Sequence, residues 1–266
     1  MKYEQELYVA KQAAILAGTE IMKIYNTEFD VEMKEDESPV TNADIAANEI
    51  ILSKLKEKFP NYAYLSEESV DDVSRIDEDL CFIIDPIDGT KEFVNRNGEF
   101  TVNIALAYKG EVVVGVIYAP VLEELYYASK ENGAYKVKER EITQLKVSDR
   151  DKDLRIAKSR SHGSELVEQL LNENRNKISK EFTVGSSLKG CFLAAGIVDS
   201  FYRFGMGTKE WDVAAMSIIV LEAGGVFKDL NGDSFKYNKE DVYNRNGYYI
   251  LNKEENLFDY KHLLNN

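Results

Sequence analysis

The sequence predicts a mixed α+β and α/β protein, in which an antiparallel N-terminal sheet with two long helices is followed by a mixed α/β half. Three observations predict this class. Apolar residues recur at helical spacing in the first 25 residues, strand-like runs joined by short turns follow one another between residues 100 and 138, and strand-like and helix-like segments alternate from about residue 145 onward. A chain of 266 residues can bury a large core as one domain or as two smaller ones.

Two long helices are predicted in the N-terminal half. The first covers residues 3–25, and its apolar face is formed by Leu7, Ala10, Ala14, Ala17, Ile21 and Ile24. The second covers residues 42–59 and is followed by Pro60. Its start, Thr41-Asn42-Ala43-Asp44, fits a capping box, so Asp44 could serve only to begin this helix.

The predicted sheet starts with a short buried strand over residues 80–84, which we expect Pro86 and Gly89 to end. The acidic segment before it, residues 71–79, is expected to be a solvated loop rather than a set of metal ligands. Strands over residues 100–108, 111–119, 125–129 and 134–138 then predict an antiparallel meander, with a tight turn at Asn132-Gly133 before the last of them.

The C-terminal half alternates between the two kinds of element. We expect strands over residues 154–158, 182–185, 198–202, 226–228 and 248–252, and helices over residues 165–173, 188–195 and 213–223, with a further helix at the C-terminus. No repeat or low-complexity linker divides the chain. We therefore expect an N-terminal α+β subdomain, residues 1–144, to pack tightly against an α/β subdomain, residues 145–266, with the active site between them.

The composition restricts the partners of the chain. A formal net charge of −14 argues against a nucleic-acid binder, which needs a basic surface. An acidic protein can still bind a small anionic substrate when metal ions invert the local potential. No apolar run is long enough to span a membrane, and the first six residues lack the pattern of a signal peptide, so we expect a cytoplasmic protein without integral membrane association. The two cysteines, Cys81 and Cys191, are expected to be buried thiols.

Two carboxylates three residues apart stand at the exit of a predicted strand, in the segment DPIDGT (residues 85–90). Carboxylate oxygens are the ligands that Mg²⁺ prefers, and the turn after them, at Gly89 and Thr90, can offer backbone N–H groups and a hydroxyl to an anion. This combination predicts magnesium-assisted phosphate chemistry. The alternative is an ordinary strand-to-helix turn in which an aspartate caps the helix.

Two further acids could join this pair. Glu67 follows another short strand-like segment, and Asp212 opens the helix expected over residues 213–223. Together Glu67, Asp85, Asp88 and Asp212 carry four negative charges, which about two or three Mg²⁺ ions would neutralise while keeping positions open for water and substrate.

The sequence resembles a known family of phosphatases. Five segments match the lithium-sensitive, magnesium-dependent phosphatases of the inositol monophosphatase superfamily, in family order: residues 38–44 (SPVTNAD), 65–69 (LSEES), 85–93 (DPIDGTKEF), 185–189 (GSSLK) and 211–215 (WDVAA). Lys91-Glu92-Phe93 and the run over residues 97–106 resemble the branch of CysQ-type 3′(2′),5′-bisphosphate nucleotidases. The resemblance implies a layered αβαβα sandwich of the sugar-phosphatase type.

The resemblance also implies roles around the metal ions. Glu67 and Asp85 would contact a first Mg²⁺ and Asp88 and Asp212 a second, and the backbone carbonyl of Ile87 would be a further ligand. All of these except Asp85, together with Gly89 and Thr90, would also surround the reacting phosphate. A metal-activated water would attack phosphorus, deprotonated with help from Glu67 or from a hydrogen-bonded pair formed by Asp44 and Thr90.

Four other residues are expected to bind the rest of the substrate. The resemblance implies that Ser186, Lys189 and Arg203 lie near the nucleoside or a second phosphate, with His162 beside them. Two cations suit a 5′-phosphate, whereas a neutral inositol ring does not need them. We therefore expect a phosphomonoesterase that converts adenosine 3′,5′-bisphosphate to AMP and phosphate. A homodimer is compatible with the sequence.

The sequence leaves three alternatives open. An inositol-1-phosphate or fructose-1,6-bisphosphate phosphatase could use the same metal centre. A phosphatase of the haloacid dehalogenase type would use an aspartyl nucleophile, although its two aspartates stand one residue closer together than Asp85 and Asp88. A non-catalytic metal-binding or nucleotide-binding protein could keep the fold without turnover.

Overall fold

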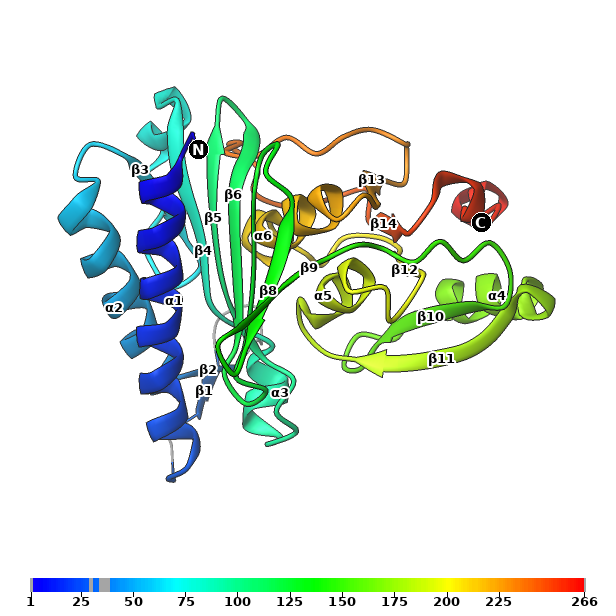
Figure 1. Ribbon diagram of the computed structural model, residues 1–266, viewed down its shortest axis with the longest axis horizontal. Helices are drawn as coiled ribbons and strands as arrows, with labels where there is room; N and C mark the ends of the chain where they lie inside the picture. Colours follow the sequence, from blue (N-terminus) through cyan, green and yellow to red (C-terminus); the bar gives the residue numbers. More distant parts are fainter. Residues whose placement is uncertain (1, 29–30, 34–38, 266) are drawn as a thin grey trace.

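Figure 1 shows the computed structural model of the chain, which describes residues 2–28, 31–33 and 39–265. Ser38, the first residue of one family-like segment, lies outside the described residues. Helices α1 (Glu4–Tyr25) and α2 (Asn42–Lys58) begin and end within one residue of the predicted bounds. The predicted capping box at the start of α2 is confirmed, with the Asp44 carboxylate accepting a hydrogen bond from the Thr41 backbone N–H at 2.8 Å.

A seven-stranded sheet carries these helices on one face. In chain order its strands are β3 (Ala63–Ser66), β4 (Leu80–Asp88), β5 (Thr101–Tyr108), β6 (Glu111–Ala119), β7 (Glu124–Ser129), β8 (Ala134–Lys138) and β9 (Glu141–Gln144). Strands β3 and β4 are parallel, and each later pair of neighbours is antiparallel, so the predicted meander is confirmed. The short helix α3 (Thr90–Val94) follows β4 directly.

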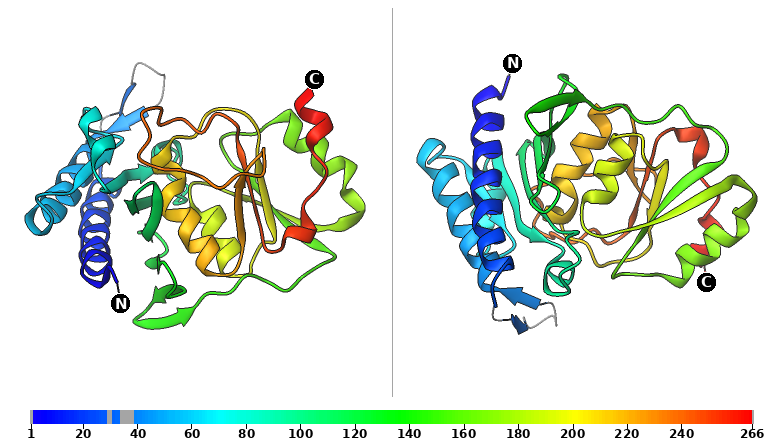
Figure 2. Two further views of the ribbon diagram at one scale, coloured as in Figure 1. Left: turned by 90° about the horizontal axis from the view of Figure 1, so that it is seen from above. Right: turned by 60° about the horizontal axis from the view of Figure 1, so that its bottom comes forward.

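A five-stranded sheet forms the core of the C-terminal half. Its strands, in spatial order, are β11 (Ile178–Val184), β10 (Leu154–Ser159), β12 (Ser200–Arg203), β14 (Tyr248–Leu251) and β13 (Val226–Asp229). Helices α5 (Leu188–Ala194) and α6 (Glu210–Glu222) lie between the two sheets, and α4 (Glu165–Glu173) covers the outer face of the second one (Figures 1 and 2). The succession α1 and α2, first sheet, α5 and α6, second sheet, α4 confirms the layered αβαβα sandwich.

Helix α6 is the central layer, and almost all of it is buried. It approaches β6 so closely that a Cβ atom on Gly115 would lie 2.6 Å from the carbonyl oxygen of Ala215. Only glycine fits at such a contact. Because α6 packs against both sheets, one core, rather than two separate ones, fixes the position of its N-terminus.

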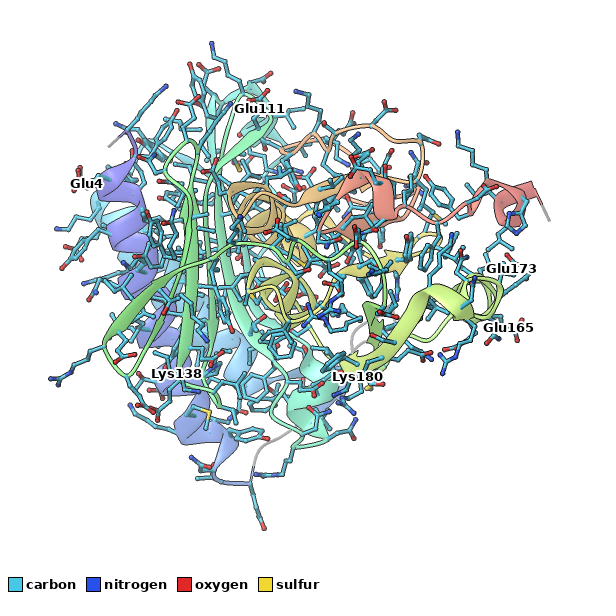
Figure 3. All side chains as sticks on the ribbon, turned by 45° about the vertical axis from the view of Figure 1, so that its right-hand side comes forward. Glu4, Glu111, Lys138, Glu165, Glu173 and Lys180 are labelled. Atoms are coloured by element: carbon cyan, nitrogen blue, oxygen red, sulfur yellow. The ribbon has the colours of Figure 1, made fainter. Side chains whose placement is uncertain are left out.

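Charged side chains of both signs lie on the outer surfaces, Lys138 and Lys180 among them. Figure 3 shows Glu4 on α1 at one side of the molecule and Glu165 and Glu173 on α4 at the other. Cys81 and Cys191 are free and fully buried, as predicted. In the part of the chain that the structure describes, no helix has the length and apolar character needed to cross a membrane.

Several boundaries differ from the prediction. Strand β4 continues past Pro86 to Asp88, because the pairing with β5 shifts between Asp85 and Asp88 and leaves no ladder bond that Pro86 would have to donate. Residues 71–79 are not wholly a solvated loop: Val73–Asp77 is a 3₁₀ helix whose Arg75 is buried and bonded to Asp71. The C-terminal helix is replaced by the short 3₁₀ turns Glu254–Asn256 and Lys261–Asn265.

Some elements were not predicted at all. Strands β1 (Val31–Met33) and β2 (Pro39–Thr41) pair with each other but have only three residues each, too few to show a periodicity. The edge strand β9 is fully exposed, so it has no buried face that could produce an alternating pattern. The division into subdomains at residues 144 and 145 stays a prediction.

Candidate active site and metal centre

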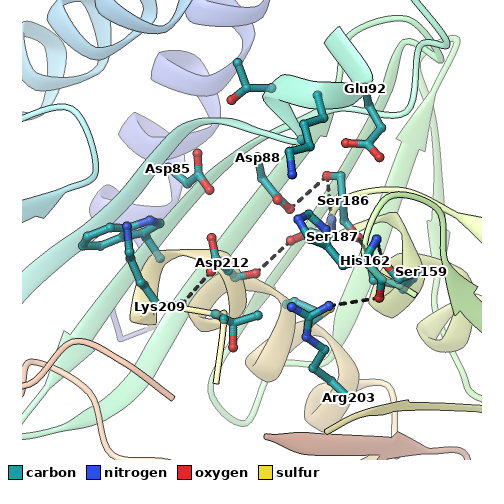
Figure 4. A pocket seen from close by; sticks show the side chains of 18 of the residues that line it. Asp85, Asp88, Glu92, Ser159, His162, Ser186, Ser187, Arg203, Lys209 and Asp212 are labelled. Atoms are coloured by element: carbon teal, nitrogen blue, oxygen red, sulfur yellow. Dashed lines mark hydrogen bonds between the residues drawn. The ribbon is translucent and has the colours of Figure 1, made fainter. Parts of the chain in front are cut away.

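Three aspartates converge at one end of the first sheet. Asp85 and Asp88 come from the last part of β4 and Asp212 from the first turn of α6, and each offers an oxygen that lies within 4.8 Å of those of the other two (Figure 4). Among the residues that the structure describes, these side chains form a group able to hold a metal ion.

The irregular end of β4 explains how residues 85 and 88 can face the same site. In a regular strand side chains alternate, so two residues three positions apart point to opposite faces. Here Asp85 pairs with Asn103 and Asp88 with Thr101, so three steps on β4 match two steps on β5. The extra residue turns the Asp88 side chain back toward Asp85.

The electrostatics of this group call for a cation. Asp85 is 1% exposed, and its Oδ1 atom is buried without a hydrogen-bond partner. Burial, followed by the negative charges of Glu67, Asp88 and Asp212, raises the pKa of Asp85 well above its usual range. Burial and the neighbouring acids raise the pKa of Asp212 in the same way. An unpartnered buried oxygen among close carboxylates fits a hard divalent cation, which would supply the missing positive charge.

Glu67 and Ile87, the two other predicted ligands, lie in the same pocket. Glu67 directly follows β3, whose parallel pairing with β4 brings both strand ends to one edge of the sheet. It is not part of the three-aspartate group, although its charge acts on Asp85 and Asp212. The backbone carbonyl of Ile87 accepts a hydrogen bond from the Thr90 hydroxyl at 3.2 Å.

Thr90 is the last residue of the DGT turn (residues 88–90), and its side chain contacts helix α2. Its hydroxyl lies 3.3 Å from Oδ1 of Asp44, while Oδ2 of Asp44 accepts bonds from the Thr41 backbone N–H and hydroxyl. The expected approach of Asp44 to Thr90 is therefore present, and it coexists with the helix-capping role of Asp44. Gly89 allows the turn between Asp88 and Thr90, because its φ of 94° lies in the left-handed region.

The opposite wall of the pocket carries the four residues that were expected to bind the rest of the substrate. The Ser186 hydroxyl donates to Oδ2 of Asp88 at 2.9 Å, and the Lys189 ammonium donates to the carbonyl of Ser186. Lys189 is 8% exposed, and burial lowers its pKa. Arg203 donates to the backbone carbonyl of His162 at 3.2 Å (Figure 4).

His162 stands among positive charges at the rim. Partial burial of its ring and the charges of Arg203, Lys91 and Lys189 lower the pKa of His162 to about 4, so the ring is neutral at neutral pH. The pocket between the two walls has a volume of about 380 Å³, in the range of small-molecule sites.

Sequence reasoning missed a polar network behind the aspartates. The Asn103 amide donates to Oδ2 of Asp88 at 3.3 Å and to the Ser187 hydroxyl at 2.9 Å, and the Thr101 and Ser186 hydroxyls are 2.6 Å apart. These contacts fix the Asp88 carboxylate. One signal was available: Thr101 and Asn103 are polar residues two positions apart in an otherwise apolar strand, so both face one side of the sheet.

Lys209 was also missed. Its backbone N–H donates to Oδ2 of Asp212 at 2.6 Å, which satisfies the backbone amide before α6 and orients that carboxylate (Figure 4). The tryptophan and aspartate of the segment at residues 211–215 indicated this helix start, but the capping residue before them gave no recognisable pattern.

Comparison with known proteins agrees with this geometry. Residues 2–258 match the profile of the inositol monophosphatase family. The chain belongs to this family. This membership excludes a phosphatase of the haloacid dehalogenase type.

Individual members of the family match over most of their length. The chain is 40% identical over 243 residues to the 3′(2′),5′-bisphosphate nucleotidase CysQ of Salmonella typhimurium, covering 90% of this chain and 96% of that protein. It is 38% identical to the CysQ nucleotidase of Escherichia coli over the same shares of the two proteins. The crystal structure of CysQ from Bacteroides thetaiotaomicron superposes with a TM-score of 0.82 at 34% identity, covering 95% of this chain and 99% of that one. A Thermotoga maritima IMPase superposes with a TM-score of 0.79 at 26% identity, over 93% and 92% of the two chains.

Proposed function

We propose that this family member is a Mg²⁺-dependent phosphomonoesterase that hydrolyses adenosine 3′,5′-bisphosphate to AMP and phosphate. One observation carries the proposal: the oxygens of Asp85, Asp88 and Asp212 converge in a pocket whose opposite wall presents Lys189 and Arg203. A cluster of carboxylates that can bind cations, facing a wall with two basic side chains, matches a substrate with two phosphate groups. The CysQ relatives are named as 3′(2′),5′-bisphosphate nucleotidases, and this substrate belongs to that class.

The chain offers ligands for two or three ions. Glu67 and Asp85 would hold the first, Asp88 and Asp212 the second, and the carbonyl of Ile87 would complete the set. Bound there, Mg²⁺ would neutralise charge on the phosphoryl oxygens and make an attacking water more acidic. The amide of Asn103 and the hydroxyl of Ser186 keep Asp88 in place for this task.

Thr90 would orient the attacking water. Its hydroxyl has one hydrogen and two acceptors in reach, Asp44 Oδ1 at 3.3 Å and the Ile87 carbonyl at 3.2 Å. When the carbonyl of Ile87 is used as a ligand, the hydrogen goes to Asp44, and the oxygen of Thr90 then accepts a hydrogen bond from the water. Glu67 or the pair of Asp44 and Thr90 would take up the proton.

The reacting phosphate would lie against the DGT turn, between Gly89 and the aspartates. Lys189 uses one of its three ammonium hydrogens on Ser186, so two remain for the second phosphate, with the Arg203 guanidinium beside it. His162 is neutral and can donate or accept one hydrogen bond to the nucleoside. A cytoplasmic location belongs to this proposal, and a homodimer is compatible with it.

Hydrolysis assays with purified protein test this function. We expect release of phosphate from adenosine 3′,5′-bisphosphate in Mg²⁺ with a kcat/KM well above that for inositol 1-phosphate or fructose 1,6-bisphosphate, and no release in EDTA. Asp88→Asn should abolish activity, with Asp79→Asn, at an exposed pair with Lys109, as the matched control. A preference for inositol 1-phosphate would favour an inositol-1-phosphate phosphatase instead. The Thermotoga IMPase is a structural relative of that kind. Full activity of Asp88→Asn would contradict the metal assignment.

A further inference from the structure

The pocket contains one carboxylate that the proposed mechanism does not use. Glu92 is on α3, two residues after Thr90, lines the pocket and is only 3% exposed. A buried acid is costly unless it is hydrogen-bonded, and this one lies in a pocket that must accept anions. Its Oε1 atom accepts a hydrogen bond from the Ser161 hydroxyl, across 69 residues of sequence.

Ser161 belongs to a short rim segment, residues 159–162, that follows the end of β10 and contributes Ser159 and His162 to the pocket (Figure 4). Beyond Ser159 this segment has no regular secondary structure. Side chains from other elements hold it instead. Glu92 binds Ser161 from α3, and Arg203 binds the carbonyl of His162 from β12.

A second carboxylate holds the same segment from outside the pocket. Glu99, in the loop before β5, accepts two hydrogen bonds from the guanidinium of Arg160, both at 2.6 Å, and one from the backbone N–H of Gly185. Arg160 is exposed, so this pair contributes less than its geometry alone would indicate. The part-buried bond between Glu92 on α3 and Ser161 is therefore the better shielded of these two polar contacts with the rim.

Backbone contacts restrict where the Glu92 side chain can go. A Cβ atom on Gly185 would lie 2.8 Å from Cγ of Glu92, and one on Gly89 would lie 3.3 Å from its Oε2. The two glycines enclose the side chain and leave its carboxylate directed at Ser161. Glu92 thus forms a fixed strut between the helix that carries Thr90 and the segment that carries His162.

We infer that Glu92 is a positioning residue that sets the rim segment at residues 159–162 for the part of the substrate beyond its reacting phosphate. The inference rests on the proposed function, since it gives the rim the nucleoside side of a bisphosphate. Glu92 acts through Ser161 and does not contact the metal-binding carboxylates in this role. Loss of the strut should weaken substrate binding and leave the metal-dependent step unchanged.

A set of variants separates this role from a general structural one. Glu92→Ala should raise KM for adenosine 3′,5′-bisphosphate about tenfold with kcat little changed, the effect of losing one hydrogen bond to a charged group. Glu92→Gln keeps an acceptor oxygen at the same position and should restore KM. Ser161→Ala should raise KM like Glu92→Ala, and the double variant should be no worse than the poorer single one, because both remove the same bond. Should Glu92→Ala fold poorly, Ser161→Ala tests the bond from the rim side.

Hydrogen exchange adds a readout that does not depend on the substrate. Amides of residues 160–163 should exchange faster in Glu92→Ala than in the unaltered protein, and Glu173→Ala, which breaks an exposed pair with His262 on the outer layer, should leave them unchanged. If the unaltered protein does not hydrolyse the bisphosphate, the proposed function fails, and the exchange data with KM for the monoester it does hydrolyse still test the strut. Native exchange in Glu92→Ala, or lower kcat and Mg²⁺ affinity at unchanged KM, would overturn the inference.

Discussion

Replacing Asp85 by asparagine should change the stability of the protein in opposite directions with and without a divalent cation. Asp85 is buried, its Oδ1 has no partner, and neighbouring acids raise its pKa. In the metal-free protein the negative charge of Asp85 destabilises the folded state, and Asp85→Asn removes that charge. In Mg²⁺ the same charge binds the ion, so the variant should lose both activity and stabilisation by the metal.

The size of this destabilisation follows from the distances between the three aspartates. Two unit charges 4.8 Å apart repel by about 3.5 kcal/mol at an effective dielectric constant of about 20. Asp85 belongs to two such pairs, so full ionisation would impose about 7 kcal/mol, comparable with the whole stability of a typical domain at about 5–15 kcal/mol. Proton uptake and relaxation relieve most of this. We expect Asp85→Asn to stabilise the metal-free protein by about 1–3 kcal/mol, which is a rise in Tm of a few degrees.

Thermal unfolding in EDTA and in excess MgCl₂ measures both effects. The unaltered protein should gain about 2.7 kcal/mol when Mg²⁺ is at a hundredfold excess over Kd, and the variant should gain much less. Because the pKa of Asp85 is raised in the folded state, the penalty is complete above that pKa, shrinks as the pH falls below it and is gone below the pKa of the unfolded chain, so the two proteins should converge in acid. Asp79→Asn, at an exposed ion pair, is the control. A variant that is less stable than the parent in EDTA, or that keeps the full response to Mg²⁺, would refute the reasoning.

Three other substitutions test separate parts of the structure. Thr90→Val should lower kcat at least tenfold with an unchanged Tm, whereas Thr90→Ser, which keeps the hydroxyl near Asp44, should recover most of it in steady-state assays. Lys189→Met removes the buried cation and should reduce kcat/KM for adenosine 3′,5′-bisphosphate more than for inositol 1-phosphate; equal losses would place Lys189 outside the second phosphate site. Gly115→Ala should destabilise the protein by about 1–3 kcal/mol in urea denaturation, since the new methyl group meets the Ala215 carbonyl; an unchanged midpoint would mean that α6 can shift.

The long elements could be predicted because their signals are local. Apolar spacing places α1 within one residue of its observed bounds, and the capping box with Pro60 does the same for α2. The turn at Asn132-Gly133 separates β7 from β8 as expected. The acids of the site were also found, because they stand next to breaks in these patterns. Strands β1 and β9 are fully exposed and β2 has only three residues, so the local sequence contains no period to detect.

Contacts between distant segments account for what could not be predicted. The partner of Thr101 is 85 residues away at Ser186, and the partner of Glu92 is 69 residues away at Ser161. Each of these residues alone is an ordinary polar side chain. Even the DPIDGT motif predicts only that two aspartates are near each other; that both face one pocket depends on the pairing shift between β4 and β5.

Helix capping and catalytic geometry are not competing explanations for the aspartates in this fold. Asp44 and Asp212 both occupy the third position of a helix, and Asp44 closes a capping box with Thr41. In each, one oxygen accepts a backbone N–H bond at the helix start, from Thr41 at 2.8 Å and from Lys209 at 2.6 Å. A carboxylate has a second oxygen, which Asp44 directs to Thr90. The bond at the start of each helix therefore also fixes the rotamer that directs Asp44 at Thr90 and Asp212 at Asp85 and Asp88, so the rigidity of α2 and α6 is passed directly to the site.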